Sequence, residues 1–270
     1  MKPTIKEMFG TDQPMIALLH LHALPGDPDY PKDGCIDDVI EQARKDLHAL
    51  QNGGVDGILF SNEFSLPYLD RIEPVTVGAM GYILGVLKGE IKVPFGVHVI
   101  ADADATLELV AAVEADFVRS VFSGAYASEV GIRVKNVANT LRRKKALGLD
   151  DLIMFYMINA ESDGDLSMRD IATIAKNVQF KCHPDVMCVS GIQAGHGVDK
   201  ELLDIVKGAV PGVPVYANTG CNAKTIAEKL TYIDGGFVGT TFKVDGKFEN
   251  DVDEARVREF MDVVKANRTR

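Results

Sequence analysis

The sequence contains no tryptophan, and its 270 residues include only four cysteines. No two of these cysteines, Cys35, Cys182, Cys188 and Cys221, are separated by only two residues. This spacing excludes a paired-cysteine zinc knuckle or a thioredoxin-type motif. We therefore expect four reduced thiols of a cytosolic protein and no disulfide framework.

The sequence also lacks a long hydrophobic run and an excess of basic residues. No apolar run approaches the ~18 residues that a membrane span requires, and the first residues, MKPTIKEMFGTDQP, contain no apolar signal core. Lysine and arginine total 29 against 39 aspartates and glutamates, which gives a net charge of -10. Because phosphate backbones are bound by clustered cations, this balance argues against a nucleic-acid partner. We expect a cytoplasmic protein without a membrane span.

Short apolar runs alternate with longer amphipathic segments along the whole chain. The runs are β-branched and aromatic-rich, and several are apolar on both faces, which is typical of parallel strands covered by helices. They occupy residues 15–22, 55–64, 94–101, 116–124, 152–160, 185–191, 213–220 and 235–243. The fourth run is followed by a loop and then a basic helix near 135–147. This rhythm predicts a single α/β domain over 1–270 that folds as a (β/α)₈ TIM barrel. A doubly wound open sheet is the alternative, although the chain lacks its nucleotide fingerprint.

Polar side chains gather where the apolar runs end. Active sites of this barrel class lie at the carboxyl ends of the strands, so these residues are the candidates for a functional site. They are His20, His22, Asn62, Glu63, His98, Arg119, Asn159, Ser190, Asn218, Thr219, Gly220, Gly239, Thr240, Thr241 and Lys243. Asp102 also follows a run, but its position suits the N-cap of a helix.

The last two runs end in the sequences ANTGCNAKTI and GGFVGTTFK. Phosphate-binding barrels surround a phosphoryl group with backbone N–H groups from the corresponding two loops. Glycine lets the backbone approach closely, and threonine hydroxyls add donors. We expect a phosphate-bearing substrate here, bound by Asn218, Gly220, Gly239, Thr240, Thr241 and Lys243. Two ordinary turns are the alternative interpretation.

The first run ends in two histidines, His20 and His22, which alternation along a strand would place on one face. Metal-dependent barrel hydrolases begin with such a pair, but their further ligands are missing from the ends of later strands, where Asn159 and Ser190 stand. We therefore assign no metal, although a divalent ion held by His20, His22 and a further residue such as His196 stays open. A general acid or base role for either histidine, or a plain hydrogen bond to the backbone, is equally open.

Glu63 is the predicted general base, because a partly buried carboxylate at a strand end can accept a proton from substrate. Its alternative role is a salt bridge to Arg119. We expect Arg119, Asn159 and Asn218 to orient hydroxyls or to stabilise an enolate oxygen. Asn62, His98 and Ser190 complete the predicted substrate-binding set.

Several stretches together resemble the BtpA/SgcQ family over nearly the whole chain. They are LLHLHALPGDP, ALQNGGVDGILFSNEFSLPY, PFGVHV, FSGAYASE, DVMCVSG, ANTG and TTFKVDGKFENDVD. The match is nearer the SgcQ-like bacterial branch, which is similar to proteins encoded beside genes of sugar uptake and sugar-phosphate metabolism. The resemblance implies a ribulose-phosphate-binding type of barrel. The other branch is named for a cyanobacterial photosystem I biogenesis factor, and the family supplies no agreed catalytic residue.

The leading functional hypothesis is an isomerase, epimerase or lyase that acts on a phosphorylated sugar or a similar small molecule. The alternatives are a metal-dependent hydrolase or lyase built on His20 and His22, and a non-enzymatic assembly factor. A homo-oligomer is also expected, through the apolar, glycine-bearing helix VGAMGYILGVL at 77–87.

Overall fold

Eight parallel strands close into a barrel in the computed structural model, which describes residues 1–191, 197–218 and 220–268. The barrel strands are β1 (Met15–His20), β2 (Gly57–Ser61), β3 (Phe95–His98), β4 (Phe117–Ser120), β7 (Ile153–Met157), β9 (Val186–Val189), β10 (Val215–Ala217) and β11 (Gly236–Val238). The barrel closes because β1 pairs with both β2 and β11. Each strand lies within one of the eight predicted runs, so the predicted TIM-barrel class is confirmed.

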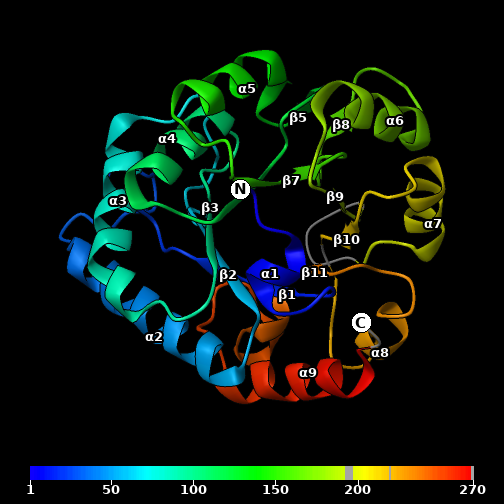
Figure 1. Cartoon of the computed structure of the whole chain (residues 1–270). Helices are drawn as coiled ribbons and strands as arrows, with labels where there is room; N and C mark the ends of the chain where they lie inside the picture. Colours follow the sequence, from blue (N-terminus) through cyan, green and yellow to red (C-terminus); the bar gives the residue numbers. More distant parts are fainter. Residues whose placement is uncertain (192–196, 219, 269–270) are drawn as a thin grey trace.

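The helices form a ring outside the barrel (Figure 1). They are α2 (Ile36–Gly53), α3 (Pro74–Leu87), α4 (Ala103–Val113), α5 (Val137–Ala146), α6 (Ile171–Cys182), α7 (Lys200–Ala209), α8 (Ile226–Lys229) and α9 (Glu254–Asn267). Asp102 accepts a hydrogen bond from the Ala105 N–H and is the N-cap of α4, as predicted. No helix among the described residues is long and apolar enough to cross a membrane.

A short N-terminal helix, α1 (Ile5–Phe9), lies inside the ring of helices (Figure 1). Its Phe9 ring packs 5.5 Å from Phe117 and 6.4 Å from Phe155, both inside the barrel. Phe9 also abuts Gly57, the first residue of β2, so α1 fills the amino-terminal end of the barrel. The carboxyl end is therefore the side on which a ligand can enter.

A second, three-stranded antiparallel sheet was not predicted. It consists of β5 (Ala125–Ser128), β6 (Gly131–Val134) and β8 (Gly164–Asp165), in the order β6-β5-β8. We call this sheet the lid. The segment after the fourth run was expected to be a loop, and that expectation is wrong. The strands are short and rich in alanine and glycine, which carry little intrinsic preference for β structure.

The eighth predicted run, 235–243, is a strand only near its start, at Gly236–Val238. Thr240 and Thr241 belong to a 3-10 helix, η2 (Thr240–Phe242), which is followed by η3 (Val244–Gly246). Lys243 lies between them and forms an isolated antiparallel bridge with Val252. The strand thus ends at Val238, five residues before the end of the predicted run at 243.

Candidate active site

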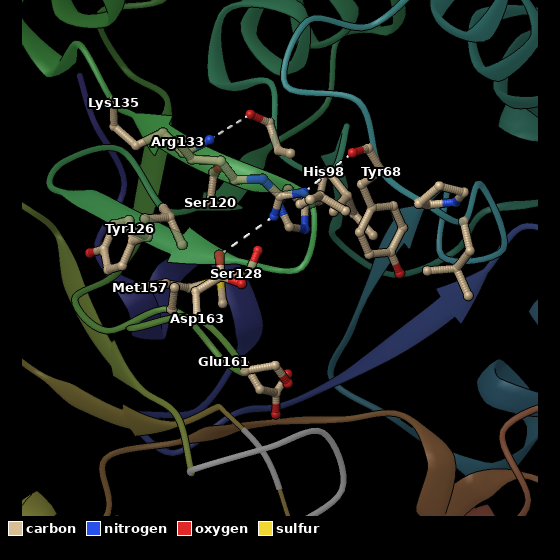
Figure 2. A pocket seen from close by; sticks show the side chains of 18 of the residues that line it. Tyr68, His98, Ser120, Tyr126, Ser128, Arg133, Lys135, Met157, Glu161 and Asp163 are labelled. Atoms are coloured by element: carbon tan, nitrogen blue, oxygen red, sulfur yellow. Dashed lines mark hydrogen bonds and ion pairs between the residues drawn. The ribbon is translucent and has the colours of Figure 1, made fainter. Parts of the chain in front are cut away.

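A cavity of about 370 Å³ lies at the carboxyl ends of the barrel strands, between the barrel and the lid. Glu63, in the loop directly after β2, lines it together with His98 on β3 and Arg119 on β4, and these three strands are neighbours in the barrel. Tyr126 and Arg133 line it from the lid, because alternation along β5 and β6 turns both side chains to the inner face. Figure 2 shows His98, Tyr126 and Arg133 around one space. The cavity also contacts Tyr68, Ser120, Ser128, Glu129, Lys135, Met157, Glu161, Ser162 and Asp163.

Arg119 is 4% exposed and carries a charge inside the barrel. One terminal nitrogen donates to the Asn218 side-chain oxygen at 3.0 Å, and the guanidinium lies 4.8 Å from the centre of the Phe237 ring. Its Nε has no hydrogen-bond partner, and no carboxylate of the described residues forms an ion pair with it. Burial lowers the pKa of Arg119, while the nearby Glu63 and Glu161 charges raise it. A buried cation in this state is suited to receive an anionic or enolate oxygen from a ligand.

A chain of amide and hydroxyl groups connects Arg119 to the neighbouring strand ends. The Asn218 side-chain amide donates to the Ser190 hydroxyl at 2.8 Å. Asn159 exchanges two hydrogen bonds of 2.9 Å with the Ser190 backbone. These bonds fix the amide orientations and so hold the guanidinium in one place. The structure therefore brings together Arg119, Asn159, Ser190 and Asn218, all four predicted from their positions at strand ends.

His98 and Asn62 each contribute a buried side-chain atom without a partner. The Nδ1 atom of His98 has no hydrogen-bond partner in the part of the chain that the structure describes, and burial holds the pKa of this histidine well below its usual value. His98 is therefore a neutral imidazole at pH 7. The Asn62 side-chain oxygen accepts from the Ile100 N–H at 2.8 Å, whereas its Nδ2 has no partner within the described ranges.

Glu63 is partly exposed to the cavity. Its carboxylate accepts a hydrogen bond of 2.9 Å from the Ser61 hydroxyl, and its backbone oxygen accepts one from the Tyr68 hydroxyl. Burial, reinforced by the Glu63 and Glu161 charges, raises the pKa of Tyr68. Within the described residues Glu63 forms no ion pair with Arg119, so the alternative of a direct salt bridge is not seen.

Arg133 joins the lid to two other loops. Its Nε lies 2.7 Å from an Asp70 carboxylate oxygen, and its terminal nitrogens contact Asp163 at 3.5 Å and the Tyr68 backbone oxygen at 3.2 Å. Figure 2 shows Arg133 reaching along the cavity beside Tyr68. Lys135 donates to the Ala101 backbone oxygen at 2.7 Å. These contacts hold the lid over the barrel mouth.

Sequence reasoning missed the lid residues Tyr126, Arg133 and Lys135, as well as Asp163 after β7. They do not follow a barrel strand directly, and the segment that carries them lacks a strong strand pattern. The available signal was the alternation of Tyr126 with small residues and of Arg133 with Ile132 and Val134.

The two opening histidines lie in different surroundings. β1 ends at His20, so the strand alternation that would align His22 with it does not continue. His20 is 4% exposed, and neither ring nitrogen has a hydrogen-bond partner among the described residues; burial lowers its pKa to about 4. His22 is half-buried against Phe64 and lines a separate cavity of about 310 Å³ beside α2. Burial lowers the pKa of His22 as well.

The predicted phosphate-binding residues that the structure describes do not line the first cavity. A Cβ at Gly239 would come within 3.0 Å of the His20 Nε2, which explains the glycine. The Thr241 hydroxyl donates to the Cys221 backbone oxygen at 2.7 Å, and the Gly220 backbone oxygen accepts from Lys229. Thr240 is partly exposed on η2.

Lys243 is 1% exposed, with its Nζ 3.8 Å from an Asp46 carboxylate oxygen on α2. Burial lowers the pKa of Lys243 and raises that of Asp46. This position favours attachment of η2 to α2 over direct contact with a phosphate.

A further cavity of about 400 Å³ adjoins the first and shares Tyr126, Ala160 and Asp163 with it. Asn159 and Ser190 line this cavity of about 400 Å³. His196 and Thr219 lie outside the described residues. Over the described part of the chain, no three His, Cys, Asp or Glu side chains are grouped so that they could hold a metal ion.

Proteins of similar sequence span nearly the same length. The chain is 46% identical to the sgc region protein SgcQ of Escherichia coli (strain K12), over 96% of this chain and 97% of that protein. It is 28% identical to the photosystem I biogenesis protein BtpA of Synechocystis sp., over 96% and 90% respectively.

Solved structures with the same fold are much more distant in sequence. The (S)-3-O-geranylgeranylglyceryl phosphate synthase of Thermoplasma acidophilum, in complex with sn-glycerol-1-phosphate, matches with a TM-score of 0.61 at 14% identity, covering 98% of this chain and 99% of that one. The N-(5'-phosphoribosyl)anthranilate isomerase of Pyrococcus furiosus matches with a TM-score of 0.54 at 11% identity, covering 94% and 99%. These likenesses show the TIM-barrel fold. The model of the BtpA family matches residues 11–266, and the chain therefore belongs to the BtpA family.

Proposed function

We propose that this chain is an enzyme that isomerises, epimerises or cleaves a phosphorylated sugar or a similar small molecule at the barrel mouth. The observation that carries the proposal is the convergence of Glu63, His98 and Arg119 on one cavity. A carboxylate, a neutral imidazole and a buried cation are the groups that proton transfer beside a carbonyl requires. The names of two structural neighbours, an isomerase of a phosphoribosyl compound and a synthase bound to a glycerol phosphate, are consistent with such a substrate.

In this mechanism Glu63 removes a proton from the carbon beside the substrate carbonyl. The carbonyl oxygen becomes an enolate, whose negative charge Arg119 receives and to which His98 can donate a hydrogen bond. The Asn218 and Ser190 side chains keep the guanidinium in place during the step. The proton then returns to a different carbon in an isomerase, or a neighbouring bond breaks in a lyase.

The loops after β10 and β11, which the sequence predicted to bind the phosphate, do not line this cavity. The positive charges of Arg133 and Lys135 on the cavity wall are the groups that favour an anionic ligand there.

A thermal-shift screen of sugar phosphates, each compared with the free sugar and inorganic phosphate, tests the substrate class. Stabilisation by a sugar phosphate well beyond that by either control is expected. If no compound stabilises the protein and a protein partner is captured instead, the assembly-factor alternative gains support.

Glu63→Gln tests the catalytic assignment with a compound found in that screen. We expect turnover to fall about 10²- to 10⁴-fold, because general-base catalysis contributes on this scale, while the Kd of the compound stays within about twofold. Glu249→Gln, an exposed residue beside the separate cavity near α2, is the matched control and should leave turnover unchanged. Unchanged turnover in Glu63→Gln would contradict the base assignment.

A further inference from the structure

Among the described residues that line the cavity between the barrel and the lid, two cations form no ion pair. They are Arg119 and Lys135, whereas Arg133 contacts both Asp70 and Asp163. Arg119 is 4% exposed, and Lys135 is partly buried. A buried charge without a counter-ion lowers the stability of a fold. The two cations therefore indicate that the ligand supplies a negative group to each of them.

Arg119 belongs to the floor of the cavity. Alternation along β4 turns Phe117 and Arg119 to the barrel interior, where Phe117 packs among other aromatic side chains. β3 pairs with β4 so that Gly96 lies opposite Phe117, which places His98 beside Arg119 two residues further along. The floor thus combines a buried guanidinium with a neutral imidazole.

The free part of the Arg119 guanidinium has a shape that a carboxylate matches. Its Nη1 atom donates to the Asn218 side-chain oxygen at 3.0 Å, whereas Nε has no partner within the described ranges and no described residue accepts from Nη2. The N–H groups of Nε and Nη2 point in parallel along one edge of the guanidinium, and two oxygens of a planar carboxylate accept such a pair together. The floor is therefore suited to a carboxylate of the ligand.

Lys135 belongs to the roof of the cavity. It directly follows β6 of the lid, and its Nζ donates to the Ala101 backbone oxygen at 2.7 Å, so two of its three N–H groups remain for a ligand. Ser128, on the paired strand β5, adds a hydroxyl to the cavity lining. Figure 2 shows Arg133 and Lys135 on one side of the cavity and Glu161 on the other. An ammonium group beside a hydroxyl is suited to a phosphate.

We propose that the ligand is a phosphorylated sugar acid, whose carboxylate lies on Arg119 and whose phosphate lies on Lys135. This inference rests on the proposed function and defines its substrate class more closely. A sugar phosphate without a carboxylate would leave the Arg119 charge uncompensated until the enolate forms, whereas an acid compensates it from the moment of binding. In a 2-oxo acid the carboxylate is bonded to the carbonyl carbon, so one edge of Arg119 serves both binding and reaction.

The acidic residues that line the cavity are compatible with this ligand. Asp163 is engaged by Arg133, and Glu129 is exposed to solvent in the turn between β5 and β6. Glu161 lies across the cavity from the lid cations (Figure 2). Glu63 is the proposed base, which approaches the carbon that loses its proton. None of these carboxylates forms an ion pair with Arg119 or Lys135 in the described chain, so both cations are available.

Isothermal titration calorimetry of the full chain with matched compounds tests the proposal. Gluconate 6-phosphate carries both groups, glucitol 6-phosphate has a hydroxyl in place of the carboxylate, and gluconate lacks the phosphate. Glycerate 3-phosphate and glycerol 3-phosphate form a shorter matched pair. We expect at least one phosphorylated acid to bind about tenfold or more tightly than its matched phosphate and than gluconate, because a bidentate charged contact is added.

The outcomes separate this inference from the proposed function. If both phosphate-only compounds bind as tightly as their matched acids, the carboxylate assignment is wrong and the proposed function stands. Tighter binding of gluconate than of every phosphorylated compound would overturn the phosphate assignment. Binding of none of the five compounds would count against both the substrate class and the proposed function.

Two substitutions distinguish the ends of the ligand. Arg119→Lys keeps the charge but removes the parallel N–H pair, so the affinity for the acid should fall about fivefold or more, while that for the matched phosphate changes by less than about twofold. Lys135→Met should weaken both compounds alike, by about tenfold, and leave their ratio unchanged. Lys176→Met, at an exposed position of α6 outside the cavity, is the matched control and should change neither affinity.

Thermal melting without ligand checks that each variant is folded. Full preference for the acid in a folded Arg119→Lys would show that the carboxylate does not lie on Arg119. Unchanged affinities in Lys135→Met would show that the phosphate does not lie on Lys135, and this second result does not depend on whether Arg119→Lys folds.

Discussion

Arg119 places a positive charge inside the barrel, and among the described residues no carboxylate forms an ion pair with it. A buried charge of this kind lowers the stability of the fold. Proteins retain such a charge where a ligand needs it. We infer that this cost is offset by function, because the same guanidinium faces the cavity.

Arg119→Met should separate binding from stability. We expect the free energy of unfolding to stay within about 1 kcal/mol of the wild-type value, because the lost hydrogen bond to Asn218 is offset by the removal of a buried charge. Stabilisation by any sugar phosphate that binds the wild type should be lost. Differential scanning calorimetry with and without the compound measures both. A variant that keeps its ligand-induced shift would show that Arg119 does not contact the ligand.

His20 makes stability depend on pH. Its pKa is about 4 when folded and near 6.5 when unfolded, so the unfolded chain binds the proton more readily between these values. Protonation of His20 in the unfolded chain therefore lowers the free energy of unfolding as the pH falls from 6.5 toward 4. This loss reaches about 3 kcal/mol below pH 4.

We therefore expect His20→Asn to lose less stability than the wild type between pH 7 and pH 4.5. Urea unfolding at a series of pH values measures the difference. His183→Asn, at the exposed left-handed C-cap of α6, where the described residues form no ion pair with the histidine and asparagine suits the backbone, is the matched control and should follow the wild-type profile. Parallel profiles for His20→Asn and the wild type would contradict the buried neutral state of His20.

At the level of elements, α1 and the lid close opposite ends of one barrel. α1 is held by a capping box between Thr4 and Glu7 and by the Phe9 ring among the interior aromatics. The lid is held by Arg133 and its contacts with Asp70 and Asp163. Apolar side chains fill the amino-terminal end of the barrel, whereas polar contacts of Arg133 hold the lid over the carboxyl end. A polar ligand can therefore enter only at the lid end.

Phe9→Ala should destabilise the barrel by about 3 kcal/mol, because a buried aromatic ring is removed and the end of the barrel cannot collapse around the space. Urea denaturation measures the loss. Lys6→Ala, on the exposed side of α1, should change stability by less than about 0.5 kcal/mol. A small effect of Phe9→Ala would mean that α1 is dispensable for the barrel.

At the level of the whole molecule, the first and last helices close the ring. α2 packs on α9, and a Cβ at Gly53 would lie only 2.3 Å from the Val257 side chain. The close approach of these two helices needs the glycine, although alanine is the better helix former.

Gly53→Ala should therefore destabilise the fold by about 1 to 3 kcal/mol through overpacking. Adding Val257→Ala should recover part of that loss, which a double-mutant cycle of thermal unfolding detects. Gly85→Ala, at an exposed position of α3 with open space around it, should instead gain about 0.5 to 1 kcal/mol. Equal effects at the two positions would show that helix propensity alone governs them.

The sequence by itself determined the barrel, because each strand and each helix carries its own local pattern of apolar spacing and capping. It also determined which residues stand at strand ends, and so pointed to Glu63, His98, Arg119, Asn159, Ser190 and Asn218. Only the tertiary structure decided which of these face the same cavity. His20 and His22, two residues apart, fall in separate surroundings because β1 ends between them. Lys243 lies against Asp46 because the chain leaves the barrel at η2. The lid forms through pairing between segments whose local sequence does not by itself favour β structure.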